Sequence, residues 1–465
     1  MEPVGRSSAL DLIRRYVLDF GVLRDNPRAF WVLQAVNVLE SVAFFSFMGV
    51  ATVLLSETLG WDDVATGWIY GAFTMLVTIS LFVTGFVTDA LGIRRTAIVA
   101  LALLLVSRGG IALAALWPGL PGRAWIVIPL LLVGSPGLAM VQTLYQAANR
   151  RFSSDRSRGA SFNVWYLLMN LGGIGAGWLI DGVHRSYGLG WGWVIAAGGA
   201  ITLVTLGVCL AAVHEPGPPP QAGPPARSAP LSGRVASVVV LPVFWRFMAL
   251  MVVVLGVRAV WAYMYLLMPK YWLRVIGPDV QMGLLQTINP WIVLIGVVLM
   301  VPLANRFRVF WQLVVGAAVS ALSLAVLVLP WAWFGADPAS GYFRMAVIMA
   351  VVMSIGELLW SPKLSEFTAA IAPPGQEGAF YGLGMMPWFV AKLVVSGLSG
   401  HMLVRWCPEG IGERIAAGGL PFWQSPEAMW LVLFGWALAG PVLATLLSRW
   451  ITQGADLAPA GRVRT

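Results

Sequence analysis

The sequence has few charged residues for its length. Asp, Glu, Lys and Arg make up only 11% of its 465 residues, whereas hydrophobic residues make up 58%. A soluble globular domain usually carries about 25% charged residues. A surface with so little charge cannot be kept in water, so a soluble protein is excluded and the chain needs lipid as its solvent.

Cysteine and histidine are also scarce, with two and three residues respectively. Cys209 lies in an apolar run and Cys407 in a polar loop, so we expect neither a disulfide between them nor a metal site. The chain lacks a histidine cluster, a Ser–His pairing and a phosphate-binding glycine loop. We therefore expect no enzymatic activity, no cofactor and no metal.

A removable signal sequence is not expected, because no apolar core precedes Phe30 and no cleavage pattern is present. The formal charge of +9 comes from basic residues that flank the apolar runs, which is typical of membrane topology rather than nucleic-acid binding. Their excess in alternate loops predicts that both termini are cytoplasmic. We expect an integral protein of the cell (inner) membrane that works as a monomer.

Long apolar runs recur along almost the whole chain. Each has roughly 20 residues, the length of a helix that spans a bilayer, whereas barrel strands would be alternating segments of about 10 residues. We therefore predict an all-α polytopic membrane protein. The twelve expected transmembrane helices cover residues 30–55, 66–88, 96–116, 125–147, 160–180, 191–213, 243–268, 284–304, 309–333, 343–368, 379–403 and 428–449.

A proline-rich stretch, GPPPQAGPPARSAP, divides these helices into six plus six. Such a composition cannot pack a core and is typical of a linker. Two six-helix bundles joined by a cytoplasmic linker form the major facilitator architecture. The expected parts are a cytoplasmic N-terminal segment (1–29), a first bundle (30–213), the linker (214–242), a second bundle (243–449) and a cytoplasmic tail (450–465).

One loop motif, Gly85-Phe-Val-Thr-Asp89-Ala-Leu-Gly92-Ile-Arg94-Arg95, resembles the signature loop of major facilitator transporters. Gly85 permits close helix approach, and Gly92 permits a tight turn. We expect these five named residues to form an inner gate, which Asp89 locks through contacts with a neighbouring helix. The alternative is a basic turn that only sets topology.

Further motifs narrow the resemblance to the proton-coupled oligopeptide transporter family, from about Glu40 to Gly400. The motifs that carry it are Asp63-Val-Ala-Thr-Gly-Trp-Ile-Tyr70-Gly71-Ala-Phe73, Arg158-Gly-Ala-Ser-Phe162-Asn-Val-Trp165-Tyr166-Leu-Leu-Met-Asn170-Leu-Gly172, Asn289-Pro290, Gly356-Glu357-Leu358-Leu-Trp-Ser361-Pro362 and Ala372-Pro373-Pro374. The resemblance implies a secondary active transporter that works by alternating access, is coupled to protons and takes peptide-like or amino-bearing substrates.

The first and fourth expected spans depart from that family. In relatives, charged and tyrosine side chains at these positions serve proton coupling and hold the carboxylate of the peptide. Only Glu40 keeps the family residue, while neutral residues replace the others: Asn37, Ser41, Phe44, Phe45, Met48 and Ala139. We expect a less polar substrate and a different coupling route, which also fits an exporter of drugs or metabolites.

Five ionisable residues fall well inside the expected spans: Glu40, Arg108, Arg258, Glu357 and Lys392. A lone charge at the bilayer centre costs at least about 2.5–3.5 kcal/mol, so such residues usually face the protein interior and pair. We expect Glu357 to pair with Lys392, because the two lie at similar depth on consecutive antiparallel helices. Glu357 also matches the family glutamate that contacts the substrate amine. A static salt bridge is the alternative.

Arg258 and Glu40 each have two expected roles. The guanidinium of Arg258 suits a substrate carboxylate, or it pairs with an acid such as Glu40 as a gate. Desolvation favours a protonated Glu40, which makes it a candidate for proton coupling alongside Glu357. Alternatively, Glu40 is a permanent partner of Arg108 or Arg258, and for Arg108 we expect a structural role.

Tyr166 and Asn170 are four residues apart and share a helix face, so we expect both to contact the substrate. Phe44, Trp360 and Lys392 complete the expected substrate site. The expected partners are a small-molecule substrate, protons or another ion, and the lipid bilayer. A non-transporting membrane sensor or scaffold remains the alternative from a different functional class.

Overall fold

The computed structural model describes residues 18, 20–154, 156–214, 240–304, 308–371 and 386–453, and these contain helices but no strand. The long helices are α2 (Arg28–Val53), α3 (Asp63–Leu91), α4 (Ile93–Leu116), α5 (Arg123–Phe152), α6 (Arg158–Asp181), α7 (Trp191–Ala212), α9 (Pro242–Leu266), α11 (Met282–Ala304), α12 (Val309–Ala325), α13 (Pro338–Ile371), α15 (Met386–Trp406) and α17 (Pro426–Leu446). The short helices are η1 (Phe20–Asp25), η2 (Leu54–Thr58), η3 (Gly182–Ser186), α10 (Met268–Val275), η4 (Val326–Val328), η5 (Trp331–Trp333), α16 (Ile411–Ala417), η6 (Phe422–Gln424) and α18 (Ser448–Ile451).

Each of the twelve expected spans overlaps one long helix, which confirms the predicted fold class, although α12 ends at Ala325, before the end of the expected span at 309–333. Ten helices in the described residues are long and apolar enough to cross a membrane. The other two long helices, α6 and α15, correspond to the expected spans at 160–180 and 379–403, although residues 379–385 lie outside the described part.

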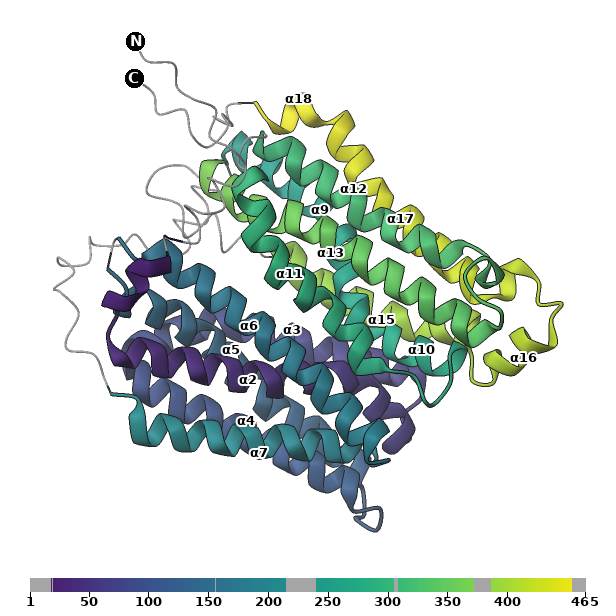
Figure 1. Cartoon of the computed structure of the whole chain (residues 1–465), viewed down its shortest axis with the longest axis horizontal. Helices are drawn as coiled ribbons and strands as arrows, with labels where there is room; N and C mark the ends of the chain where they lie inside the picture. The colour runs from purple at the N-terminus through teal and green to yellow at the C-terminus, as the bar shows by residue number, and fades with distance from the viewer. Residues whose placement is uncertain are drawn as a thin grey trace.

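The long helices form two bundles, one from α2 to α7 and the other from α9 to α17 (Figure 1). Contacts between the bundles are made chiefly by α3 with α15 and by α6 with α11. Figure 1 shows the bundles lying close together near α10 and diverging toward α18. We call these two ends of the molecule the α10 end and the α18 end.

Three parts of the expected domain division fall largely outside the described residues. These are the N-terminal segment, of which residues 1–17 and 19 are not described, the linker, of which 215–239 are not described, and the tail beyond residue 453. The helices of the first bundle extend from Arg28 to Ala212 and those of the second from Pro242 to Leu446, and the domain boundaries stay a prediction.

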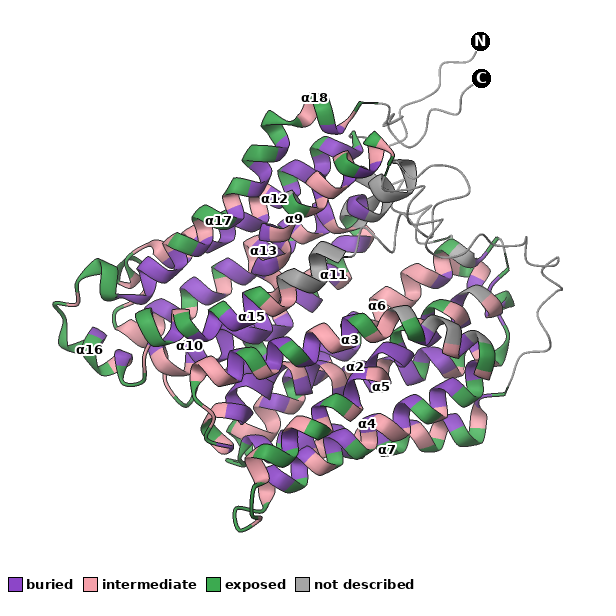
Figure 2. Ribbon diagram, turned by 180° about the vertical axis from the view of Figure 1, so that it is seen from behind, coloured by how far each residue is buried: buried purple, intermediate pink, exposed green. Residues whose placement is uncertain are grey.

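The outer surface of the bundles is apolar, as a lipid-facing surface must be. Figure 2 shows exposed residues along the outward sides of α7 and α17. Leu203 and Val204 on α7 are 57% and 59% exposed, and Leu446 on α17 is 74% exposed. In water such a surface would aggregate, but lipid tails are as apolar as these side chains. The buried side chains are therefore those at the contacts between helices.

Candidate functional site

The candidate site lies between the bundles, and its first component is a partly buried acid on α13, Glu357. The carboxylate of Glu357 accepts a hydrogen bond from Nδ2 of Asn289 on α11 at 2.7 Å, and the same amide donates to Ser354 Oγ at 3.0 Å. Asn289 precedes Pro290, whose missing N–H loosens the backbone of α11 at this point. Asn289 therefore orients the carboxylate, a role that the sequence analysis did not assign to it.

Cationic and aromatic side chains surround Glu357. Arg258 on α9 is close enough to Glu357 for electrostatic attraction, and its guanidinium carbon lies 5.8 Å from the ring centre of Trp360. That distance is within the range of a cation–π interaction. Tyr166 on α6 and Tyr265 on α9 also lie within the electrostatic range of Glu357. Both bundles thus contribute to one cluster.

Lys392 differs from expectation, because it does not pair with Glu357. Its Nζ donates a hydrogen bond to Thr78 Oγ1 on α3 at 2.9 Å, which links the second bundle to the first. Lys392 lies within electrostatic range of Arg258, a like charge. The depth estimate placed Lys392 at the level of Glu357, but the rotation of α15 turns its side chain toward α3.

Tyr166 and Asn170 lie on one face of α6, as expected. Asn170 Nδ2 donates to the backbone oxygen of Tyr166 at 2.8 Å, and Asn170 is only 5% exposed. Gly173, one turn further along α6, lies against Pro290 of α11. The expected contact residues Tyr166 and Asn170 therefore lie where the two bundles meet, beside the cluster around Glu357.

Glu40 is bound within the first bundle. Its two carboxylate oxygens accept from Nη2 and Nη1 of Arg108 on α4 at 2.6 and 2.9 Å, and Nη1 also donates to Thr202 Oγ1 on α7 at 2.5 Å. Both charged side chains are 3% exposed. Of the alternatives for Glu40, the contacts fit a permanent partnership with Arg108, which joins α2, α4 and α7.

Phe44 lies one turn beyond Glu40 and lines a cavity of about 70 Å³ between α2, α5 and α6. The neighbouring polar residues of α2 are bonded to other groups. Asn37 Nδ2 donates to the backbone oxygen of Trp165 at 3.0 Å, and Ser41 Oγ donates weakly to Asn37 Oδ1 at 3.5 Å. No charge that is free to meet a ligand reaches this cavity from the described residues.

The α10 end is held by ionic contacts that the sequence did not indicate. Asp63, at the start of α3, accepts from Lys270 at 2.6 Å and from two nitrogens of Arg274 at 2.9 and 3.0 Å. Lys270 and Arg274 lie on α10, so these bonds join the two bundles. Burial lowers the pKa of the Lys270 ammonium, although the Asp63 carboxylate acts in the opposite direction. Charges at span ends are common, so their spacing alone gave no signal.

A second contact closes the same end. Asp181, the last residue of α6, accepts from the backbone N–H groups of Gly283 and Leu284 at 2.7 and 2.8 Å. These N–H groups belong to the first turn of α11, where a helix leaves its donors unpaired and favours a negative charge. Gln286 Nε2 also donates to the backbone oxygen of Gly49 at 3.0 Å.

The expected gating loop lies between α3 and α4, at the α18 end. Gly92 has φ 79°, a left-handed conformation that favours glycine, and it separates the two helices as expected. Arg94 donates to the backbone oxygen of Leu210 on α7 at 3.0 Å, and Arg95 is exposed. The side chains at Gly85 and Asp89 lie outside the described part, so the expected lock stays a prediction.

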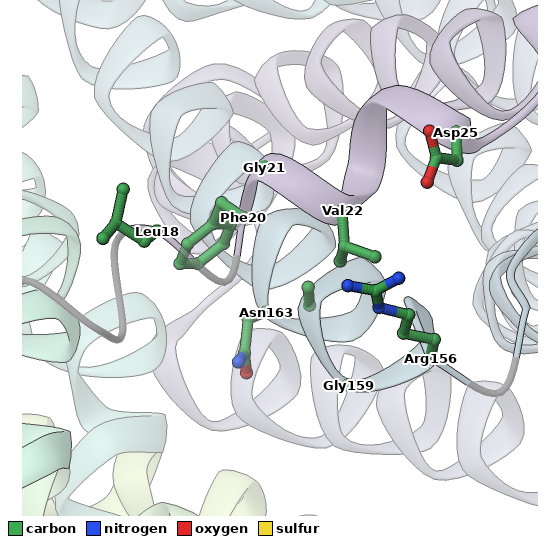
Figure 3. Close-up of a pocket in the computed structure, with 9 residues that line it drawn as sticks. Leu18, Phe20, Gly21, Val22, Asp25, Arg156, Gly159 and Asn163 are labelled. Carbon is green, nitrogen blue, oxygen red and sulfur yellow. The ribbon is translucent and has the colours of Figure 1, made fainter.

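A larger cavity of about 650 Å³ lies at the α18 end, between η1 and the beginning of α6. Figure 3 shows Arg156 extending toward Val22, with Asn163 further along the same wall. Asn26 fixes this junction, since it donates to Ser161 Oγ at 3.1 Å and accepts from Ser157 Oγ at 2.8 Å. The cavity therefore belongs to the side on which the bundles diverge.

Known proteins resemble this chain over most of its length. The sequence model of the Major Facilitator Superfamily matches residues 33–396. Dipeptide and tripeptide permease B of Xenorhabdus bovienii (strain SS-2004) is 24% identical, with 87% of this chain and 92% of that protein aligned.

Solved structures share the fold. An auto-inhibited POT family peptide transporter superposes with a TM-score of 0.68 at 15% identity, covering 93% of this chain and 99% of the other. A POT family transporter in complex with 5-aminolevulinic acid gives a TM-score of 0.69 at 14% identity, with 92% and 97% covered. The fold of twelve helices in two bundles is thus common to this chain and the two solved structures.

Proposed function

Because the chain belongs to the Major Facilitator Superfamily and is therefore a membrane transporter rather than an enzyme, we propose that it moves amine-bearing, peptide-like solutes by proton-coupled alternating access. The observation that carries the proposal is the carboxylate of Glu357. It lies between the bundles, is oriented by Asn289, and has no ion-pair partner within 4 Å among the described residues. Such a carboxylate can take up either a proton or an ammonium group.

The substrate class follows from the charges around Glu357. A substrate amine is attracted to the Glu357 carboxylate, while Arg258 and Lys392 attract a carboxylate or another anionic group. Tyr166, Asn170, Phe44 and Trp360 supply polar and aromatic contacts around it. The relatives support this class, since one is a dipeptide and tripeptide permease and another was solved with 5-aminolevulinic acid.

We assign proton binding to Glu357 in preference to Glu40. The two oxygens of Glu40 already accept from Arg108 in a charge-assisted, bidentate contact. Protonation of Glu40 would break that contact and leave a buried guanidinium unpaired, which is costly. Glu40 then serves coupling only indirectly, by holding α2 against α4.

The contacts at the α10 end support an orientation and a state. With both termini in the cytoplasm, the α10 end faces outward and is closed, and the chain is in an inward-facing state. The loop from Gly85 to Arg95 then acts as the inner gate when the bundles reverse their tilt. We place the protein in the inner membrane as a monomer, with the domain boundaries expected from the sequence.

An exporter of drugs or metabolites is the second candidate. The first bundle carries neutral residues such as Phe44 and Ala139 where the resemblance implies polar or charged side chains, and this favours a less polar substrate. The two functions differ in direction relative to the proton gradient. In proteoliposomes with an acidic interior, an exporter accumulates a hydrophobic amine inside by exchange for protons. An importer of peptides accumulates its substrate only when the exterior is acidic.

The test of the main proposal is solute and proton flux in proteoliposomes, measured with a panel of dipeptides, amino acids and hydrophobic amines. Glu357→Gln should remove proton-coupled flux, because the amide neither titrates nor attracts an ammonium group. Glu427→Gln is the matched control, since Glu427 is a buried glutamate of the same bundle that accepts from Tyr342. If Glu357→Gln transports as the native protein does, or if no solute moves at all, the proposal fails and a sensor or scaffold gains support.

A further inference from the structure

The cavity of about 650 Å³ at the α18 end has polar walls, and the cluster around Glu357 does not use it. We call it the η1 cavity, because it lies between η1 and the beginning of α6. Its volume falls within the range of about 300–1,000 Å³ that small-molecule sites occupy. Asp25 enters it from the η1 side, and Arg156 and Asn163 enter it from the α6 side.

These three polar side chains have no partner in the part of the chain that the structure describes. Neither a side-chain hydrogen bond nor an ion pair is formed there by Asp25, Arg156 or Asn163. Asp25 and Arg156 are exposed and Asn163 is partly exposed, so a dissolved molecule can reach all three. Figure 3 shows Asp25 and Arg156 on different walls. One negative and one positive group therefore stand apart in a single accessible cavity.

The beginning of α6 strengthens the positive wall. A helix leaves the N–H groups of its first turn unpaired and carries a partial positive charge at its N-terminus. Gly159 and Ala160, in the first turn of α6, line the cavity together with Arg156. Nothing lies within 4 Å of a Cβ atom on Gly159. A carboxylate can thus approach the Arg156 guanidinium and this helix end together, whereas Asp25 offers the opposite charge across the cavity.

One face of α6 leads from the η1 cavity to the cluster around Glu357. Asn163 and Asn170 are seven residues apart, and seven residues of an α-helix fall only about 20° short of two full turns. The two amides therefore share a face and are about 10 Å apart along the helix axis. The same face carries Gly177, which lies against Gly283 of α11 at the α10 end. Because the bundles diverge toward the α18 end (Figure 1), the face that packs at Gly177 is open at Asn163.

We propose that the η1 cavity is a second binding site for the transported solute, in which Arg156 binds the carboxylate and Asp25 the ammonium group of a zwitterionic, peptide-like molecule. The Asn163 amide is placed to hydrogen-bond its peptide group. This inference rests on the proposed function, because it takes the same amine-bearing solute and the same orientation, with the α18 end in the cytoplasm. It adds that the solute carries a carboxylate as well as an amine, and that it binds here as it enters or leaves the cluster around Glu357.

Protection of an introduced thiol measures occupancy of the η1 cavity without transport. Gly159→Cys places a thiol in open space in the wall, and the native cysteines are buried. It is combined with Glu357→Gln, which removes the acid that binds the amine elsewhere. Alanyl-alanine should slow the reaction of this thiol with a methanethiosulfonate reagent, measured on the full chain in nanodiscs of phosphatidylglycerol. Arg449→Cys, at an exposed position of α18 in the other bundle, should not be protected.

Two blocked ligands identify the groups that are recognised. Alanyl-alanine amide lacks the carboxylate, and acetyl-alanyl-alanine lacks the amine. Each should need a concentration about fivefold higher than alanyl-alanine for the same protection, which is the ratio expected when one ion pair in contact with water is lost.

Variants assign each group to its side chain. Arg156→Gln should raise the protecting concentration of alanyl-alanine about fivefold and leave that of its amide unchanged. Asp25→Asn should have the same effect on alanyl-alanine and leave that of acetyl-alanyl-alanine unchanged. Arg28→Gln is the matched control, because Arg28 is an exposed arginine at the start of α2 that does not line the cavity. It should change none of the three concentrations.

Three results would overturn the inference: no protection, equal protection by all three ligands, or protection that survives both Arg156→Gln and Asp25→Asn. A reaction that phosphatidylethanolamine nanodiscs slow by themselves, with no further effect of alanyl-alanine, would also overturn it, since a lipid headgroup would then occupy the cavity. If Gly159→Cys does not fold, Gly21→Cys places the thiol in the opposite wall, where nothing lies within 4 Å of a Cβ atom.

The two proposals can fail separately. Loss of proton-coupled flux in Glu357→Gln without protection of the thiol would overturn this inference alone. Native flux in Glu357→Gln together with protection would overturn the role proposed for Glu357 and leave the η1 cavity as a solute site.

Discussion

At the scale of single residues, the fold depends most clearly on the ion pair between Glu40 and Arg108. Both side chains are almost fully buried, and removal of one partner from a buried ion pair costs about 3–5 kcal/mol because the other charge is left alone. We therefore expect Arg108→Met to lower the unfolding temperature strongly. The double variant Glu40→Leu with Arg108→Met should recover much of the loss, since it removes both charges.

Thermal unfolding in detergent checks this prediction. Thr202→Val serves as the control, since it removes only one of the hydrogen bonds of Arg108 and should cost about 1 kcal/mol. If the double variant is as unstable as Arg108→Met alone, the pair does not act as a unit and the prediction is wrong.

The pairing of residues shows what the sequence determines and what it does not. Residue counting along a helix gives the expected depth of a side chain in the membrane, and Glu357 and Lys392 are both partly buried. It does not give the rotation of each helix about its axis, which directs Lys392 to Thr78. For the same reason the sequence left the partner of Glu40 open, since it does not show that α4 directs the Arg108 side chain toward α2.

At the scale of helices, the packing of α6 against α11 depends on two glycines. A Cβ atom on Gly177 would lie 2.5 Å from the backbone oxygen of Gly283, which is closer than real atoms approach. Gly177→Val should therefore push α11 away from α6 at the α10 end and weaken the contact made by Asp181. We expect the population to shift toward states in which this end is open.

Distances between spin labels at Tyr187→Cys and Trp423→Cys report this shift. The two positions lie in different bundles and are 78% and 61% exposed, while the native cysteines are buried. Gly207→Val, on α7, is the control, because nothing lies within 4 Å of a Cβ atom there. An unchanged distance distribution in Gly177→Val would contradict the prediction.

The helices themselves were predictable because their length is set by the bilayer and their composition by lipid. Apolar runs of about 20 residues located all twelve. Their ends were less predictable: α13 extends over Pro338–Ile371, beyond the expected span at 343–368. Helices continue past the lipid wherever their backbone donors still find partners, and hydropathy does not record this.

At the scale of the whole molecule, the contacts of Asp63 hold the two bundles together at the α10 end. Asp63→Asn would leave the buried ammonium of Lys270 and the guanidinium of Arg274 facing each other without an anion, which is strongly unfavourable. We expect this variant to populate states with the α10 end open and to lower stability by a few kcal/mol. Spin-label distances and thermal unfolding measure the two effects.

Glu409→Gln provides the comparison for Asp63→Asn. Glu409 lies 3.6 Å from Arg274, but its side chain is 84% exposed, and exposed ion pairs contribute little to stability. This variant should behave as the native protein does. Equal effects of the two variants would mean that Asp63 does not close the molecule.

The closed pair of Glu40 and Arg108 has a consequence for the response to membrane voltage. One elementary charge that crosses the full field contributes about 2.3 kcal/mol per 100 mV. The two charges inside the spans of the first bundle cancel and move together, so the field does almost no work on that bundle. Any electrogenic movement must arise in the second bundle, from Arg258, Glu357, Lys392 and the proton or substrate bound there. Transport currents should therefore follow the protonation of the second bundle alone.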